Sequence, residues 1–153
     1  MPSRRDLVRM TDAEAQAFLE ETHTLQVASI GRDGRPHLVA MWYGFLDGDV
    51  AFWTYGRSQK VLNLKRDPRV TCLVEDGETY ETLRGAELVG TAEIVEDRDQ
   101  VMAIARSVYE RHTGPYSDEI KPVLEAMGAK RVAVRINVES VVSWDHTKLG
   151  GAY

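Results

Sequence analysis

The sequence predicts a mostly β domain, an antiparallel barrel of six or seven strands with peripheral helices. Apolar residues alternate with a period of two in several short segments, as strands with one buried face require. Asp-Gly pairs supply turns between segments, and the strand–helix–strand alternation of a parallel sheet is absent. At 153 residues the chain has the length of one domain. We therefore expect a single domain over 1–153, with a helical N-terminus at 10–22, a core barrel at 25–145 and a C-terminal tail at 146–153.

The first half of the chain contains one predicted helix and three predicted strands. Thr11 and Glu14 have the spacing of a capping box, which begins the helix. From Leu25 the apolar period changes to two, and Asp33-Gly34 and Asp47-Gly48-Asp49 supply the turns. The three strands are expected over 25–30, 37–45 and 50–54. Since they follow one another through short turns, we expect them to form a meander.

The second half predicts further strands with helices between them. Ser58 is a good N-cap for a short helix, which Pro68 ends. Asp97 caps a longer helix with an apolar stripe, Gly128 is an expected C-cap, and Gly85 is expected to interrupt a strand pair. The expected helices lie at 60–64, between Asp97 and Gly114, and at 120–127, and the expected strands at 70–74, 80–83, 88–95, 132–138 and 141–144.

The charge and composition restrict the class of function. The formal net charge is −5, which disfavours nucleic acid or an anionic membrane as the main partner. An anion site must therefore be a local cluster of basic groups. The single cysteine, Cys72, excludes an internal disulfide framework. The start lacks the apolar segment of a secretory signal, and no apolar run approaches the ~20 residues of a membrane helix. We therefore expect a cytoplasmic protein that does not contact membranes.

Catalytic constellations that act without a cofactor are missing. The histidines His23, His37, His112 and His146 lack metal-ligand spacing, so no metal site is expected. Neither a nucleophile elbow nor a His-x-x-x-His helix is present. This pattern fits an enzyme whose cofactor performs the chemistry while the protein binds and orients it.

The most informative stretch runs from Phe52 to Lys60, where a strand leads through a loop into a helix. The first turn of a helix exposes unpaired backbone N–H groups and the positive end of its dipole. Thr54 and Ser58 add hydroxyl donors, and Arg57 and Lys60 add positive charge. Together these groups can hold a phosphate. On spacing alone a second interpretation is equally open, in which the two cations are solvated and Ser58 only caps the helix.

Residues of the second predicted strand alternate between two faces. One face must line the barrel, and the other can meet a flat ligand or a partner subunit. The first set is Leu38, Ala40 and Trp42, and the second is His37, Val39, Met41 and Tyr43. Aromatic residues of this kind also suit a barrel core or a dimer interface, which is their commoner use.

Several segments resemble the pyridoxamine 5'-phosphate oxidase-like superfamily. They are Gly31–His37, the pair Trp42-Tyr43, the run Ser58–Val70 with its Asn-Leu-x-x-Asp-Pro-Arg-Val motif, and Gly90–Glu93. Within that superfamily the chain most resembles the actinobacterial flavin/deazaflavin oxidoreductases of the B type, which use coenzyme F420. The resemblance spans about residues 10 to 145. It implies a split barrel of the FMN-binding type and a homodimer with two sites at its interface.

The resemblance also implies roles for single residues. The residues that it assigns to cofactor binding are His37, Val39, Met41, Thr54, Arg57, Ser58, Lys60, Trp144 and Lys148. Those between 54 and 60 are assigned to the cofactor phosphate, and those on the second strand to the isoalloxazine ring. Trp144 and Lys148 are expected to reach a site at the interface, unless the tail only docks Trp144 and frays. Asn63 is expected to tie the short helix to the barrel.

The implied activity is that of an oxidoreductase in which reduced F420 passes hydride to a small electron-poor acceptor, such as an enone, quinone or tetrapyrrole. Catalytic protein residues are not assigned. One alternative is an FMN-dependent oxidase or reductase, and another is a flavin- or haem-binding module without turnover. Vitamin B6 oxidation ranks lower, because the chain ends with Leu149-Gly150-Gly151-Ala152-Tyr153 instead of the Arg-Leu-x-Pro type ending of true pyridoxamine phosphate oxidases.

Overall fold

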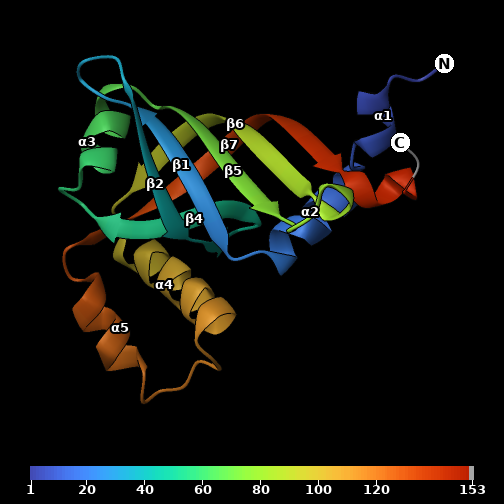
Figure 1. The fold of residues 1–153 in the computed structure, drawn as a ribbon. Coiled ribbons are helices and arrows are strands. Elements are labelled where there is room, and N and C mark those ends of the chain that lie inside the picture. Colours follow the sequence, from blue (N-terminus) through green and yellow to red (C-terminus); the bar gives the residue numbers. More distant parts are fainter. Residues whose placement is uncertain (152–153) are drawn as a thin grey trace.

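A computed structural model, which describes residues 1–151, shows a seven-stranded antiparallel sheet curled into a half-barrel with helices around it (Figure 1). The strands are β1 (Thr24–Ile30), β2 (Pro36–Trp42), β3 (Gly44–Leu46), β4 (Asp49–Tyr55), β5 (Arg69–Asp76), β6 (Arg84–Val95) and β7 (Arg131–Asp145). The helices are α1 (Arg4–Val8), α2 (Asp12–Glu21), α3 (Gln59–Arg66), α4 (Arg98–His112) and α5 (Lys121–Gly128), with short 3-10 helices η1 (Tyr80–Thr82) and η2 (His146–Leu149). The predicted mostly β barrel is confirmed. The predicted tail, 146–153, begins with η2, and its residues 152–153 lie outside the described residues.

The strand order corrects the expected meander. The sheet runs β2-β1-β5-β6-β7-β4-β3, so β1 and β2 pair as predicted, but β4 pairs with β7 and β3. The predicted strand 37–45 is divided at Tyr43, whose fully buried ring points inward and whose hydroxyl donates to the Leu19 carbonyl at 2.5 Å. The chain therefore passes from β2 at one edge of the sheet to β3 at the other. Short turns predict which strands follow one another along the chain, but the curvature of the whole sheet determines which strands pair.

Three local predictions are also corrected. Residues 80–82 form the 3-10 helix η1 instead of a strand, and β6 passes through Gly85 without a break. Gly85 leaves room for a tryptophan, since a Cβ there would lie 2.1 Å from Cζ2 of Trp144. Gly128 is the last residue of α5, and Ala129 follows in a right-handed helical conformation, so Gly128 is not a left-handed C-cap.

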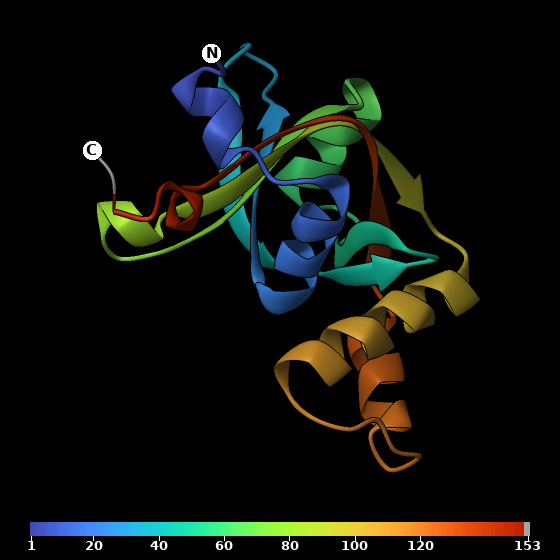
Figure 2. The ribbon, with the colours of Figure 1, turned by 90° about the vertical axis from the view of Figure 1, so that its right-hand side faces the viewer.

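The apolar core has two parts, and β4 separates them. One cluster fills the barrel and includes Val50 and Phe52, while the other includes Ala51 and Trp53 and lies against the apolar stripe of α4. Successive residues of a strand point to opposite faces, so β4 is buried on both sides. Figures 1 and 2 show α4 and α5 together, outside the barrel wall. None of the helices in residues 1–151 is long and apolar enough to cross a membrane.

Helix α3 closes one end of the barrel. Val61 and Leu64 belong to the barrel cluster, and Pro68 follows the helix end as predicted. Asn63 is fully buried and donates from Nδ2 to Ser29 Oγ at 3.1 Å, which ties α3 to β1. The predicted structural role of Asn63 is thereby confirmed.

Candidate functional site

The end of β4 and the start of α3 form a polar corner at the closed end of the barrel. Thr54 continues the inward-facing series of β4 and is only 5% exposed. Lys60, in the first turn of α3, donates from Nζ to Thr54 Oγ1 at 2.9 Å. Burial lowers the pKa of Lys60 from its ordinary value, and the positive charge of Arg131 lowers it further. The ammonium is therefore held in a partly desolvated position, where a negative ligand would stabilise it.

Ser58 occupies the N-cap position of α3, but its side chain makes no capping hydrogen bond. Its Oγ is buried and has no hydrogen-bond partner among the described residues. Of the two interpretations left open by the spacing, simple capping is therefore wrong for this hydroxyl. The first backbone N–H groups of α3 lie next to it, where a helix has no internal acceptor for them. A donor of this kind fits an anion that the protein itself does not supply.

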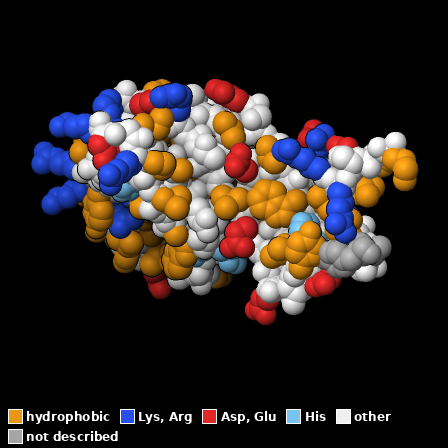
Figure 3. All heavy atoms as spheres, turned by 45° about the horizontal axis from the view of Figure 1, so that its top comes forward, with side chains coloured by type: hydrophobic (Ala, Val, Ile, Leu, Met, Phe, Trp, Pro, Cys, Tyr) orange, Lys and Arg blue, Asp and Glu red, His pale blue; other side chains and the backbone are white. Residues whose placement is uncertain are grey.

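A hollow of about 890 Å³ opens beside this corner. Ser58 and the exposed Arg57 line it, together with Arg98, Lys130 just before β7, and Arg131. The hollow also has one carboxylate, Glu96, which pairs with Lys65. Thr54 and Lys60 lie on the barrel side of the corner. Figure 3 shows that basic side chains gather at the end of the molecule where α3 lies in Figure 1. A local basic cluster within an acidic protein is what the charge analysis required of an anion site.

Arg131 is the residue of this corner that the sequence did not reveal. Its guanidinium carbon lies 4.6 Å from the ring centre of Trp53 and 4.7 Å from that of Tyr55. Its Nε is buried and has no hydrogen-bond partner within residues 1–151. Arg131 follows a helix 76 residues after Tyr55, and only the pairing of Tyr55 with Arg131 in the β4–β7 register places it here.

The three candidates on β2 lie on the inward-facing side of that strand. His37, Val39 and Met41 are half-buried, and the last two pack against the barrel cluster. Nδ1 of His37 is buried without a partner in the described part of the chain, and His37 pairs with Ser29, which accepts from Asn63 of α3. Met41 also lines a second hollow, on the α4–α5 side of the barrel.

Trp144 and Lys148 lie at the other end of the sheet. Lys148 donates from Nζ to the Arg9 carbonyl at 2.8 Å and pairs with the carboxylate of Glu14, so η2 is tied to the N-terminal segment. Trp144 packs over Gly85. Figure 1 shows this end of β7 far from α3. Within one chain the structure does not bring these two residues to the corner.

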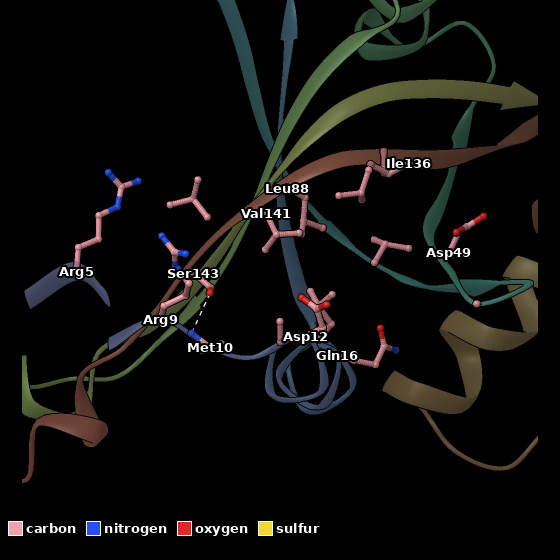
Figure 4. A pocket seen from close by; sticks show the side chains of 16 residues that line it. Arg5, Arg9, Met10, Asp12, Gln16, Asp49, Leu88, Ile136, Val141 and Ser143 are labelled. Carbon is pink, nitrogen blue, oxygen red and sulfur yellow. Dashed lines mark hydrogen bonds between the residues drawn. The ribbon is translucent and has the colours of Figure 1, made fainter. Parts of the chain in front are cut away.

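A third hollow, of about 610 Å³, lies at the mouth of the barrel near the N-terminal helices (Figure 4). Arg5 and Arg9 stand at its rim, and Leu88, Ile136 and Val141 form part of an apolar wall. None of the residues that the sequence predicted for the site lines it. The corner at α3 is therefore the better candidate site.

The corner is suited to binding and orienting a ligand. The described residues contain no cluster of three or more His, Cys, Asp or Glu side chains that could hold a metal ion. Burial raises the pKa of the Cys72 thiol to about 12, so this thiol is not a reactive nucleophile. For a phosphate the corner offers Lys60, Arg57, the Ser58 hydroxyl and the first backbone N–H groups of α3.

The curled sheet and the basic corner define the chain as a split β-barrel. A family model described as Pyridoxamine 5'-phosphate oxidase matches residues 11–145, and the chain belongs to that family. No curated protein matches it.

Three solved structures illustrate the likeness. The conserved hypothetical protein Rv2991 from Mycobacterium tuberculosis is 48% identical, with a TM-score of 0.94 over 99% of this chain and 95% of that one. An F420 reductase is 27% identical, with a TM-score of 0.65 over 82% of this chain and 94% of that one. The haem storage protein HutZ from Vibrio cholerae, at 19% identity and a TM-score of 0.67 over 86% of this chain and 94% of that one, shows the fold alone.

Proposed function

We propose that this protein is an oxidoreductase that binds a deazaflavin of the F420 type through the corner at α3. The observation that carries the proposal is a pair of groups: Lys60, which is partly desolvated and donates to Thr54, and the buried Ser58 hydroxyl, which has no partner in residues 1–151. The likeness to an F420 reductase supports the choice of cofactor.

The residues present fit the phosphate of such a cofactor. Ser58 Oγ and Lys60 Nζ would donate to its oxygens, and Arg57 would add positive charge from the rim of the hollow. Met41 and Val39 offer an apolar edge on β2 for a flat ring. When bound, a reduced deazaflavin supplies hydride to an electron-poor acceptor, which takes a proton from solvent. The protein's part is to hold donor and acceptor in contact and to exclude water.

FMN is the second candidate for the same corner. The family match favours FMN, since the matching family is described as pyridoxamine 5'-phosphate oxidase. The corner would hold the phosphate of either cofactor.

We also propose that the functional unit is a homodimer. The resemblance assigns Trp144 and Lys148 to the site, yet they lie far from α3 in the same chain, so a site that includes them needs a second copy.

A fluorescence titration with F420 and FMN in parallel tests the proposal. We expect the wild-type protein to bind F420 more tightly than FMN. Lys60→Ala removes a charge-assisted hydrogen bond and should weaken binding by about 1–3 kcal/mol. Lys121→Ala removes the same charge from an exposed position on α5 and should leave the affinity unchanged.

The outcomes separate the candidates. Tight binding of FMN with no response to F420 would replace the deazaflavin by a flavin. If Lys60→Ala binds each cofactor as tightly as the wild-type protein does, the corner at α3 does not bind the cofactor. A protein that binds cofactor but leaves it reduced with every enone and quinone offered would be a binding module and not an oxidoreductase.

A further inference from the structure

A second cleft lies between the barrel wall and the two helices outside it. It has a volume of about 520 Å³, within the range of small-molecule sites, which is roughly 300–1,000 Å³. Met41 and Trp42 of β2 and Trp53 of β4 form one side, and Val123 and Met127 of α5 form the other. The side chains that line it are aromatic, aliphatic or thioether for the most part, so the cleft favours a flat apolar molecule.

Among the described residues that line this cleft, Arg131 alone is charged. Its guanidinium rests on Trp53 and Tyr55, and its Nε is buried with no partner in residues 1–151. Arg131 as a whole is half-buried, and the described residues that line the cleft include no carboxylate. A cationic donor in such a cleft favours a ligand that brings its own anionic oxygen.

Trp42 gives the cleft a fixed aromatic wall. Its ring is 57% exposed, yet it stacks on His112 with a centroid distance of 4.5 Å and an angle of 8° between the planes. The His112 Nε2 is in turn hydrogen-bonded to the Tyr43 carbonyl at 3.1 Å. An exposed tryptophan that is held in one orientation is ready to stack on a further planar ring.

The cleft adjoins the proposed cofactor site at two residues. Met41 lies on the face of β2 assigned to the cofactor ring and also lines the cleft. Arg131 lines both the cleft and the hollow beside Ser58, and its charge acts on Lys60. A molecule in the cleft would therefore lie beside a cofactor held by the corner.

We propose that this cleft is the acceptor pocket, and that its substrate class is a planar, electron-poor ring carrying an anionic oxygen that Arg131 binds. The choice of acceptor rests on the proposed function, whereas the binding chemistry of the cleft does not. In the reaction, a quinone of this class accepts one hydride from reduced cofactor and one proton from solvent and becomes the hydroquinone.

The first test measures binding without cofactor. The probe is 2-hydroxy-1,4-naphthoquinone, which is anionic at neutral pH, and the comparison is the neutral 2-methoxy-1,4-naphthoquinone. In protein labelled with ¹³C at the methionine methyl groups, we expect the anionic probe to shift the signals of Met41 and Met127. The signal of Met10, which lines the hollow at the barrel mouth, should stay in place. Movement of the Met10 signal alone, or of none, would overturn the proposal.

Two variants on α5 test the position of the pocket. Val123→Trp fills the mouth of the cleft, and Glu125→Trp adds the same side chain to an exposed position that does not line it. Val123→Trp should weaken naphthoquinone binding by about tenfold or more, on the scale by which a filled apolar pocket rejects a ligand. Glu125→Trp should bind as wild-type protein does. Equal binding by the two variants would contradict the assignment.

Arg131→Met tests the charge. Wild-type protein should prefer the anionic quinone to the methoxy analogue by about tenfold, and Arg131→Met should abolish that preference. Arg131→Lys keeps the positive charge but loses the planar guanidinium, so it should retain part of the preference for the anionic quinone. A preference that survives in Arg131→Met would show that another group binds the anion.

Kinetics with the cofactor that binds in the fluorescence titration separates the two proposals. Val123→Trp should raise KM for 2-hydroxy-1,4-naphthoquinone about tenfold and leave the Kd of the cofactor unchanged. Quinone binding in the cleft without reduction would sustain the pocket and refute hydride transfer. If Val123→Trp reduces the quinone with the rate and KM of the wild-type protein, the cleft is not the acceptor pocket, but the protein is still an oxidoreductase.

Discussion

At the scale of single residues, the environment of Lys60 disfavours its charged form in the free protein. Its ammonium is partly withdrawn from water and lies near a second cation, and both effects favour the neutral amine. Thr54 supplies one acceptor, but no negative charge. A lysine in such a position is unfavourable in the free protein and favourable once an anion binds, which is the arrangement that a binding site requires.

The pH dependence of cofactor binding follows from this lowered pKa. Lysine is charged below its pKa, and the free protein loses the Lys60 charge at a lower pH than an ordinary lysine, whose pKa is 10.5. A bound phosphate raises the pKa again, so affinity falls as the pH rises through the lowered value. A titration with F420 or FMN at increasing pH should show this loss below the range of ordinary lysines.

Lys60→Arg is the matched variant, because arginine stays charged over the whole range. Its affinity for the cofactor should stay constant where that of the wild-type protein falls, while Lys121→Ala should follow the wild-type curve. A loss of affinity at the same pH in Lys60→Arg would assign the titration to another group.

Asn63 stabilises the fold at the candidate site, because its hydrogen bonds hold α3 against the barrel. Its side chain donates to Ser29 and accepts from Gln59 Nε2 at 2.8 Å and from Arg66 at 3.2 Å. Asn63→Ala leaves the buried Ser29 hydroxyl without this partner and should lower the free energy of unfolding by about 1–3 kcal/mol. Urea unfolding measures the loss. Asn137→Ala, at an exposed position, should change it by less than about 0.5 kcal/mol, and equal midpoints for the two variants would contradict this role of Asn63.

The sequence predicted the residues of the corner that are close together along the chain. Thr54, Ser58 and Lys60 fall within seven positions, so the strand–loop–helix pattern places them at one end of the barrel. Arg131 was missed because its place depends on the β4–β7 register, which no local pattern contains. The absence of a capping bond at Ser58 was also unpredictable, because it depends on the side-chain torsion and not on the residue type.

The same contrast holds for the secondary-structure elements. The capping box of Thr11 and Glu14 and the apolar stripe of α4 are local signals, and both correspond to observed helices. The strand order is non-local, and the expected meander fails because Tyr43 divides the second strand. Gly85 shows a similar limit, since a glycine within a strand can mark a break or a close approach, and only the position of Trp144 distinguishes the two.

The pairing of β6 and β7 depends on a second close approach, at Gly90. The register shifts between Val89 and Gly90, and a Cβ on Gly90 would lie 2.0 Å from the backbone oxygen of Asn137. Gly90→Ala should therefore force the two strands apart and destabilise the protein by about 1–3 kcal/mol, measured by urea or thermal unfolding. Gly114→Ala is the control, because a Cβ there meets nothing within 4 Å. Equal stability of the two variants would show that β6 and β7 accommodate the added methyl group without loss of free energy of unfolding.

For the whole molecule, the main question is how the two ends of the barrel can act together. The corner at α3 lies at one end, and Trp144 and Lys148 lie at the other. The outer face of β2, an edge strand, exposes Pro36 and Leu38, the latter to 67%, and neither of them lines the acceptor cleft. An apolar stripe on an edge strand favours contact with another chain. Under the proposed homodimer, a second copy covers this stripe and contributes its Trp144 and Lys148 to the corner.

A charge placed on this stripe tests the arrangement. Wild-type protein should have the mass of a dimer in size exclusion with light scattering, and Leu38→Glu should have the mass of a monomer, because it would bury a carboxylate in the contact. Ala103→Glu, which adds the same charge to the exposed side of α4, should remain dimeric. If the partner supplies Trp144 and Lys148, Leu38→Glu should also bind cofactor at least about tenfold more weakly at equal folded fraction. A monomeric wild-type protein, or a dimeric Leu38→Glu variant that binds cofactor normally, would mean that each chain completes its site alone.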